Sequence, residues 1–185
     1  RELAQLMGGE IGVDSEPGRG STFWFTIRVA GPQLTAVAAP DLHELAGRRL
    51  LIVEDNSTNR TTLSHQAQAW GMQVETAPDG ETALGLLRDA VDRDEPFALA
   101  LVDMKMPRMD GIDLVHAIKA DHFLAGTPTV MMTSLGREDE IAAARRAGAV
   151  ASLGKPVRRD EFRAVVAEVL HPTLGRSSGA RTAPP

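Results

Sequence analysis

The fold of this protein is decided by the stretch Leu50-Leu51-Ile52-Val53-Glu54-Asp55, in which an apolar run leads directly into two carboxylates. A short, unbroken apolar run is typical of a strand that is buried on both faces of a sheet. Similar runs recur downstream at residues 72–76, 97–102, 129–132 and 150–153. Segments with helical periodicity follow each run, at residues 56–70, 79–90, 110–120, 137–147 and 158–170. This alternation predicts parallel pairing through right-handed crossovers, and therefore an α/β domain with a doubly wound five-stranded parallel sheet over residues 48–170.

The composition limits the possible functions. The chain has 185 residues, with 20 Lys+Arg against 25 Asp+Glu, a net charge of −5 and no Cys. A dispersed negative charge argues against direct nucleic-acid binding, and the lack of Cys excludes a disulfide framework and a thiol nucleophile. No apolar stretch approaches the roughly 20 residues that span a bilayer, and no signal peptide is apparent. We expect a cytoplasmic piece of a longer protein, and leave open a membrane anchor elsewhere in the parent.

The first 30 residues have a different pattern. Apolar residues at positions 3, 6 and 7 precede Gly8-Gly9, which predicts the end of a helix. Alternating residues on both sides of a turn at 16–20 then predict a β-hairpin. Residues 31–47 are rich in Ala, Pro and Gly and indicate a linker. Residues 171–185 lack apolar periodicity, so we expect a disordered tail.

Chemically useful side chains follow four of the expected strands. Glu54 and Asp55 follow the first strand, Asp103 the third, Thr133 the fourth and Lys155 the fifth. In doubly wound folds, ligands bind beyond the carboxyl ends of the strands. Three carboxylates there would repel one another, and Mg²⁺ relieves this conflict because it prefers oxygen ligands and often joins carboxylates to phosphate. The sequence therefore predicts Mg²⁺ as the cofactor.

Asp103 is a candidate nucleophile toward a phosphoryl group, and its attack would give an acyl phosphate. The charge on the phosphoryl oxygens then needs fixed donors, for which Lys155 offers a compact cation and Thr133 a hydroxyl. Asn59 and Arg60 also lie near this acidic edge in the sequence. We interpret them as part of a solvated helix face rather than as residues that shape the docking of a phosphoryl donor.

These features together resemble the receiver domain of two-component response regulators. The gaps of 30 residues from Asp103 to Thr133 and of 22 from Thr133 to Lys155 are those of the family. The segments that match its motifs are residues 51–56, 101–111, 132–134 and 154–156. The resemblance implies a flavodoxin-like sheet with strand order 2-1-3-4-5.

The resemblance also implies roles for individual residues. Asp103 would be the phosphoacceptor, Lys155 would bind the phosphoryl group, and Thr133 would sense it and move. The Mg²⁺ site would be formed by Glu54, Asp55, Asp103 and the backbone carbonyl of Lys105.

One position departs from the family pattern. Ser152 occupies the place on the fifth strand where most receivers carry Tyr or Phe. An aromatic residue there is expected to swing inward when Thr133 moves, so its absence puts the usual output switch in doubt and favours a relay role. By resemblance, the chain takes a phosphoryl group from phosphohistidine onto Asp103. It then passes the group to a histidine phosphotransfer protein or returns it to the parent kinase.

Residues 6–25 resemble the C-terminal end of a sensor histidine kinase ATP-binding domain, with the helix after the ATP lid and the final hairpin. Together the two halves are similar to the join region of a hybrid sensor histidine kinase. The chain shows no phosphoacceptor-histidine helix, no Asn-rich metal-binding helix and no glycine-rich lid. We therefore leave open whether this piece has enzymatic activity of its own.

Alternative functions fit the sequence less well. A Mg²⁺-dependent phosphohydrolase that forms an aspartyl phosphate usually has a second Asp where this chain has Lys105. A flavin-binding module would need a hydroxyl-rich loop after the first strand, where Glu54 and Asp55 would repel phosphate. An interaction module that is never phosphorylated would not need the acidic pocket. Lys105 itself prompts a hypothesis: its ammonium lies over the phosphoryl group, hinders water and prolongs the phosphorylated state.

Overall fold

The computed structural model describes residues 5–6, 8–16, 18, 20–26, 45–134 and 136–170. It divides the chain into two units, Arg1–Ala39 and Pro40–Pro185, which are described separately. The expected tail, most of the expected linker and most of the expected N-terminal helix lie outside the described residues. Leu45, which was expected in the linker, is buried in the core of the second unit, so packed structure begins before residue 48.

The first unit contains the predicted hairpin, in which β1 (Ile11–Glu16) pairs antiparallel with β2 (Gly20–Phe25). Gly12 lies opposite Trp24, and a Cβ at Gly12 would come within 2.3 Å of the indole ring. Glycine therefore lets the ring cover the neighbouring strand. Large apolar side chains are exposed on this hairpin, namely Ile11, Val13, Phe23 and Phe25. Isolated two-stranded hairpins are marginally stable in water, so these side chains need apolar partners.

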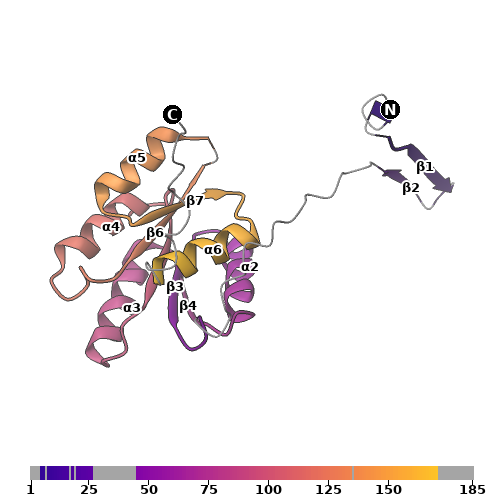
Figure 1. The fold of residues 1–185 in the computed structure, drawn as a ribbon. Helices are drawn as coiled ribbons and strands as arrows, with labels where there is room; N and C mark the ends of the chain where they lie inside the picture. The colour runs from indigo at the N-terminus through magenta and orange to yellow at the C-terminus, as the bar shows by residue number, and fades with distance from the viewer. Residues whose placement is uncertain are drawn as a thin grey trace, which may run out of the picture. The chain divides into compact units, whose positions relative to one another are not determined.

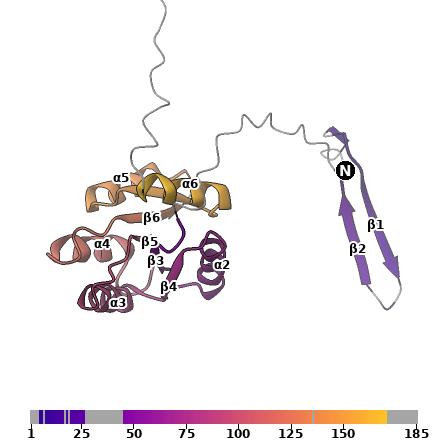
Figure 2. The same ribbon diagram turned by 60° about the horizontal axis from the view of Figure 1, so that its bottom comes forward.

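The second unit is the predicted doubly wound sheet (Figure 1). Its elements in chain order are β3 (Arg49–Val53), α2 (Ser57–Gln68), β4 (Gln73–Ala77), α3 (Gly80–Asp92), β5 (Leu99–Asp103), α4 (Gly111–Ala120), β6 (Thr129–Ser134), α5 (Glu138–Ala147), β7 (Ala151–Lys155) and α6 (Arg159–Leu170). All neighbouring strands are parallel and the order across the sheet is β4-β3-β5-β6-β7, part of which can be followed in Figure 2. Counted from β3, this is the expected order 2-1-3-4-5.

Polar caps fix where three helices begin on the side of the sheet where the strands end. The side chains of Asn56, Asp79 and Asp110 accept hydrogen bonds from backbone N–H groups in the first turns of α2, α3 and α4. Such caps satisfy donors that the helix itself leaves without partners. The C-terminal end of α5 is set by Gly148, whose left-handed backbone stops the helix.

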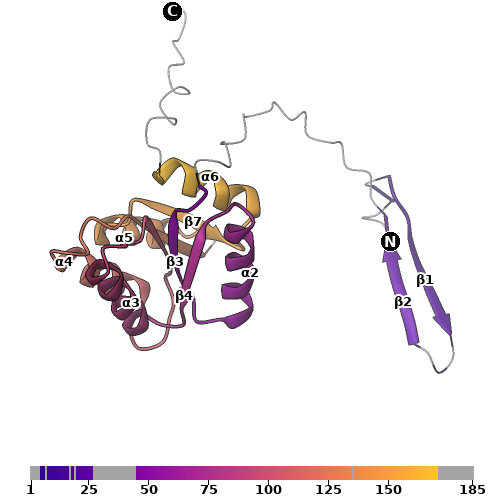
Figure 3. The same cartoon turned by 90° about the horizontal axis from the view of Figure 1, so that it is seen from below.

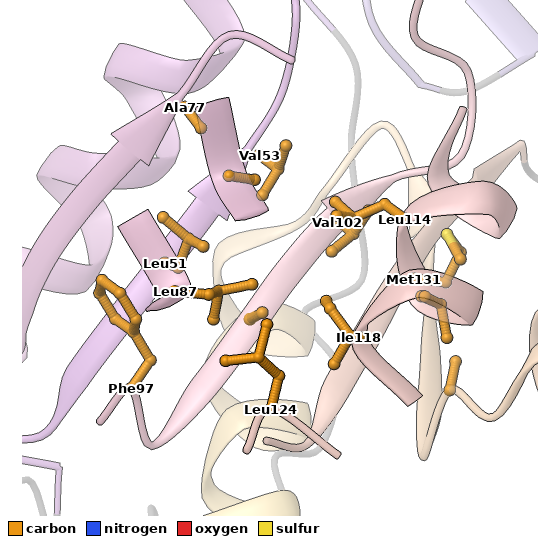
Figure 4. Packing of buried hydrophobic residues seen from close by; sticks show 14 of the residues in the cluster. Leu51, Val53, Ala77, Leu87, Phe97, Val102, Leu114, Ile118, Leu124 and Met131 are labelled. Atoms are coloured by element: carbon orange, nitrogen blue, oxygen red, sulfur yellow. The ribbon is translucent and has the colours of Figure 1, made fainter. Parts of the chain in front are cut away.

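Two hydrophobic clusters hold the helices on opposite faces of the sheet (Figure 3). One cluster joins α3, α4 and α5 to side chains such as Leu51 and Val102, and Figure 4 shows Leu87 of α3 and Ile118 of α4 among its residues. The other joins α2 and α6 to Leu50 and Ile52 and contains the edge-to-face pair of Trp70 and Phe162. Successive strand residues thus serve opposite cores, which leaves the strand ends free for polar chemistry. Among the described residues, no helix has the length and hydrophobicity needed to cross a membrane.

Candidate functional site

The strand register brings the predicted site residues to one edge of the sheet. Val53 pairs with Val102, so Glu54 and Asp103 each lie one residue beyond this pair. Asp103 pairs with Met132, which places Thr133 just past it on the next strand. Glu54, Asp103 and Thr133 are 1%, 4% and 2% exposed, whereas Asp55 is exposed. The edge therefore combines buried carboxylates with one that solvent reaches.

The three carboxylates form a donor set that suits a hard divalent cation. One oxygen each from Glu54, Asp55 and Asp103 lies within 4.8 Å of the others. A cluster of carboxylate oxygens without nitrogen or sulfur ligands is the kind of site that Mg²⁺ prefers. The residues present therefore fit the expected ion.

Lys155, the last residue of β7, supplies the positive charge of the site. Its Nζ lies 2.8 Å from Glu54 Oε2 and 2.8 Å from Asp103 Oδ2. Burial by itself would lower the pKa of Lys155, but its hydrogen bonds to Asp103 and Glu54 prevail and raise the pKa. Burial also raises the pKa of Asp103, against the opposing effect of Lys155, and the nearby charge of Glu54 adds to the increase. The ammonium thus partly offsets the repulsion between the two buried carboxylates.

Hydrogen bonds from the start of α2 hold the loop that carries Glu54 and Asp55 in place. The side chain of Asn59 donates to Glu54 Oε1 at 3.3 Å. The guanidinium of Arg60 donates to the backbone carbonyls of Glu54, at 2.6 Å, and Asp55, at 3.2 Å. Asn59 is exposed, as expected for a solvated helix face, whereas Arg60 is partly buried, and both side chains also hold the loop that carries the site. A helix that begins directly after a strand turns its first residues back over the strand end, and that geometry is not visible in residue types.

The opposite wall of the site is held by Glu140 of α5, which sequence reasoning missed. This carboxylate is 6% exposed and accepts a hydrogen bond from the backbone N–H of Ser134 at 2.7 Å. Its Oε1 lies 2.9 Å from Nζ of Lys105. The hydrogen bond from Ser134, followed by that from Lys105, lowers the pKa of Glu140. The only sequence signal was a run of three acidic residues in the first turn of α5, which is common at helix N-termini and did not single out Glu140.

The loop after Asp103 carries Lys105 and is tightly packed. The backbone N–H of Lys105 donates to Asp103 Oδ1 at 3.3 Å, while its ammonium lies on Glu140. Gly111, at the start of α4, packs so closely on this loop that a Cβ there would lie 2.3 Å from the carbonyl oxygen of Asp103. Glycine at this position therefore lets α4 begin directly against the backbone of Asp103 and Met104.

A small pocket lies at Asp103, and a larger cleft adjoins it. The pocket, of about 80 Å³, is lined by Asp103, Met104, Lys105, Met132, Ser134, Glu140 and Lys155. The cleft, of about 480 Å³, lies between α2 and the residues after β7 and shares Glu54 and Lys155 with the site. Ser152, at the position where most receivers carry an aromatic residue, pairs with Met131 on β6 and is partly buried.

The chain is similar to sensor kinases over most of its length. The sensor histidine kinase AruS of Pseudomonas aeruginosa is 35% identical over 171 residues, which are 91% of this chain and 16% of AruS. The autoinducer 2 sensor kinase/phosphatase LuxQ of Vibrio vulnificus is 32% identical over 88% of this chain and 19% of LuxQ. The chain thus spans less than a fifth of the length of these curated relatives.

Solved structures with the same fold include a chemotaxis response regulator and the receiver domain of a sensor histidine kinase. The chemotaxis response regulator CheY4 of Vibrio cholerae is 29% identical with a TM-score of 0.62, over 68% of this chain and 100% of that one. The receiver domain of the sensor histidine kinase PA1611 from Pseudomonas aeruginosa is 25% identical with a TM-score of 0.58, over 68% of this chain and 98% of that one. That structure has a magnesium ion coordinated in its active-site cleft.

Residues 50–167 match the family model of the response regulator receiver domain. This range runs from the second residue of β3 into α6 and contains the three carboxylates, Thr133 and Lys155. The chain therefore belongs to the response regulator receiver domain family.

Proposed function

We propose that this chain is the phosphoacceptor receiver of a phosphorelay within a hybrid sensor histidine kinase. The observation that carries this proposal is the position of Lys155, whose ammonium is held 2.8 Å from the carboxylate of buried Asp103. A carboxylate next to a fixed cation, in a pocket of about 80 Å³, suits the capture of a small phosphoryl group.

In the proposed reaction, an Oδ atom of Asp103 attacks the phosphorus of a phosphohistidine. The new P–O bond forms as the P–N bond breaks, and the departing imidazole carries a proton taken up from solvent. Glu54, Asp55, Asp103 and the backbone carbonyl of Lys105 would hold Mg²⁺, which supplies charge neutralisation to the phosphoryl oxygens. The ammonium of Lys155 would then bind the phosphoryl oxygens, and the Thr133 hydroxyl would donate a hydrogen bond to one of them.

The onward step is transfer to a histidine phosphotransfer protein or back to the parent kinase. Ser152 supports this relay role, because a serine lacks the ring that would transmit movement of Thr133 to an output domain. The phosphohydrolase alternative is not favoured, since both the family match and the sensor-kinase relatives point to a receiver.

We also propose that residues 1–30 are the end of a kinase ATP-binding domain, joined by residues 31–47 to the receiver at 48–170. An alignment over 91% of the chain is too long to fit inside the receiver, so the similarity to AruS includes upstream residues. The exposed apolar side chains of β1 and β2 are consistent with a hairpin that completes a larger sheet.

The proposal is tested by incubating the protein with Mg²⁺ and acetyl phosphate, with Asp103→Asn as the matched variant. We expect acid-labile phosphorylation that requires both Asp103 and Mg²⁺, at a stoichiometry near one. Uptake of phosphate by Asp103→Asn, or no uptake by the wild type, would contradict the receiver function. Sustained turnover of acetyl phosphate would instead support the phosphohydrolase.

A further inference from the structure

Glu140 joins two loops beside Asp103, and the proposed phosphotransfer assigns it no role. Its Oε2 accepts a hydrogen bond from the backbone N–H of Ser134 at 2.7 Å, and its Oε1 one from the Ser134 hydroxyl at 3.4 Å. The same Oε1 lies 2.9 Å from Nζ of Lys105. The Glu140 side chain is 7% exposed and that of Lys105 is 67% exposed. A buried carboxylate thus holds the tip of a long, largely solvated side chain.

Lys105 and Glu140 both line the small pocket into which Asp103 opens. The backbone N–H of Lys105 is hydrogen-bonded to Asp103 Oδ1, so the lysine side chain starts directly beside the phosphoacceptor. A phosphoryl group bears about −1.5 to −2 charges and three acceptor oxygens. When Asp103 is phosphorylated, the ammonium of Lys105 therefore has two anionic partners within reach, the phosphoryl oxygens and Glu140.

The lifetime of the phosphorylated state depends on the access of water. In hydrolysis, a water oxygen attacks the phosphorus and the P–O bond to Asp103 breaks. The products are the Asp103 carboxylate, inorganic phosphate and a proton. An ammonium over the phosphoryl oxygens occupies part of the path of this water, whereas an ammonium held on Glu140 leaves the path open.

We infer that Glu140 is a positioning residue that shortens the lifetime of phosphorylated Asp103 by retaining Lys105 at the rim of the pocket. This inference rests on the proposed phosphoacceptor function and concerns the regulation of the same site. Lys105 contacts Glu140 in the structure, and it shields the phosphoryl group only when Glu140 releases it.

The test compares the half-lives of phosphorylated variants. Glu140→Gln keeps the size of the side chain and an acceptor for the Ser134 N–H, but it removes the charge that attracts Lys105. After phosphorylation by acetyl phosphate and Mg²⁺ and removal of the donor, acid-labile phosphate is followed over time. We expect a half-life longer than that of the wild type by roughly three- to tenfold. Glu140→Asp, which keeps the charge but shortens the reach to Lys105, is expected to lengthen the half-life as well.

Two controls separate this role from a structural one. Asp139→Asn makes the same charge change one residue earlier, where the side chain pairs with Arg137, and should leave the half-life unchanged. In a Lys105→Met background, Glu140→Gln should no longer alter the half-life. An unchanged or shorter half-life in Glu140→Gln would overturn the inference, as would an effect that persists without Lys105. If the wild type takes up no phosphoryl group, the proposed function itself fails before any variant is compared.

Discussion

The two sides of the site around Asp103 are built differently. The acidic side, formed by Glu54 and Asp55 after β3, is held by Lys155, by Asn59 and by two hydrogen bonds from Arg60 to its backbone. These bonds surround a glutamate that is 1% exposed. The acidic side is thus fixed by several contacts from different elements.

The opposite side, formed by Lys105, Ser134 and Glu140, depends on one carboxylate. Ion pairs that involve a largely exposed lysine contribute little stability and are easily exchanged. On the acidic side, by contrast, Glu54 and the adjacent backbone are held by several hydrogen bonds. The residues that face an incoming phosphoryl group can change partners when a new charge arrives.

The largest effect on this contrast is expected from removal of Lys155, one of the residues that hold the acidic side. Lys155→Ala should slow phosphorylation by acetyl phosphate roughly 100-fold, because a preorganised donor to the phosphoryl oxygens is lost. Mg²⁺ affinity, measured by calorimetry, should not fall, because the ammonium no longer competes for Glu54 and Asp103. Parallel loss of Mg²⁺ binding would show that Lys155 only maintains the structure. Lys155→Arg should not restore the rate, since the guanidinium is larger and planar.

A second test concerns the backbone beneath the opposite side. Gly111→Ala places a Cβ against the carbonyl oxygen of Asp103 and should lower the free energy of unfolding by about 1–3 kcal/mol, measured by urea denaturation. Gly85→Ala in α3 is the matched control, because nothing lies within 4 Å of its added Cβ. That substitution should stabilise the protein by roughly 0.5–1 kcal/mol. Equal effects of the two substitutions would argue against close packing at Gly111.

Arg60 offers a more local test of the acidic side. Arg60→Gln removes the donors that hold the carbonyls of Glu54 and Asp55, and it should weaken Mg²⁺ binding roughly tenfold, as loss of outer-shell partners does. Arg88→Gln, which removes an exposed arginine paired with Asp121, should leave the affinity unchanged. Equal affinities for wild type and Arg60→Gln would mean that the loop keeps its shape without the arginine.

The smallest expected effect concerns pH and stability without Mg²⁺. Because burial raises the pKa of Asp103, the contribution of this carboxyl to stability is fully present below its unfolded pKa and is lost as the pH rises through its folded pKa. Ionised Asp103 therefore lowers the stability of the metal-free protein. Asp103→Asn should raise the urea midpoint at about pH 7, with a smaller gain at about pH 4. A gain that is independent of pH would contradict this explanation.

Much of the architecture could be predicted from the sequence, because the pattern of apolar residues identifies the strands and helices and the charged residues identify the strand ends. Apolar runs that end in charged residues, such as Val53 before Glu54, identify both the strand and its functional end. In a parallel sheet the strand ends meet, so Glu54, Asp103 and Lys155 could be placed together before any distance was known. The strand order was implied by the family resemblance, and the observed order agrees with it.

The contacts of Glu140 and Arg60 could not be predicted, because they depend on the rotation of a helix about its axis. Glu138, Asp139 and Glu140 are equivalent in sequence, but only Glu140 turns toward Ser134. The periodicity of a helical segment does not fix this rotation. Likewise, the carbonyls that Arg60 reaches are present at every residue and leave no mark on the sequence.

The ammonium of Lys155 is, in effect, a counter-ion tethered to the chain. Between Glu54 and Asp103 it partly neutralises the two carboxylates, which a dissolved cation would otherwise have to do. The strands can therefore assemble around their acidic edge without waiting for a cation from solution. Folding and loading of the site are then separate events, and a cation that binds the folded site adds stability that grows with its concentration by mass action.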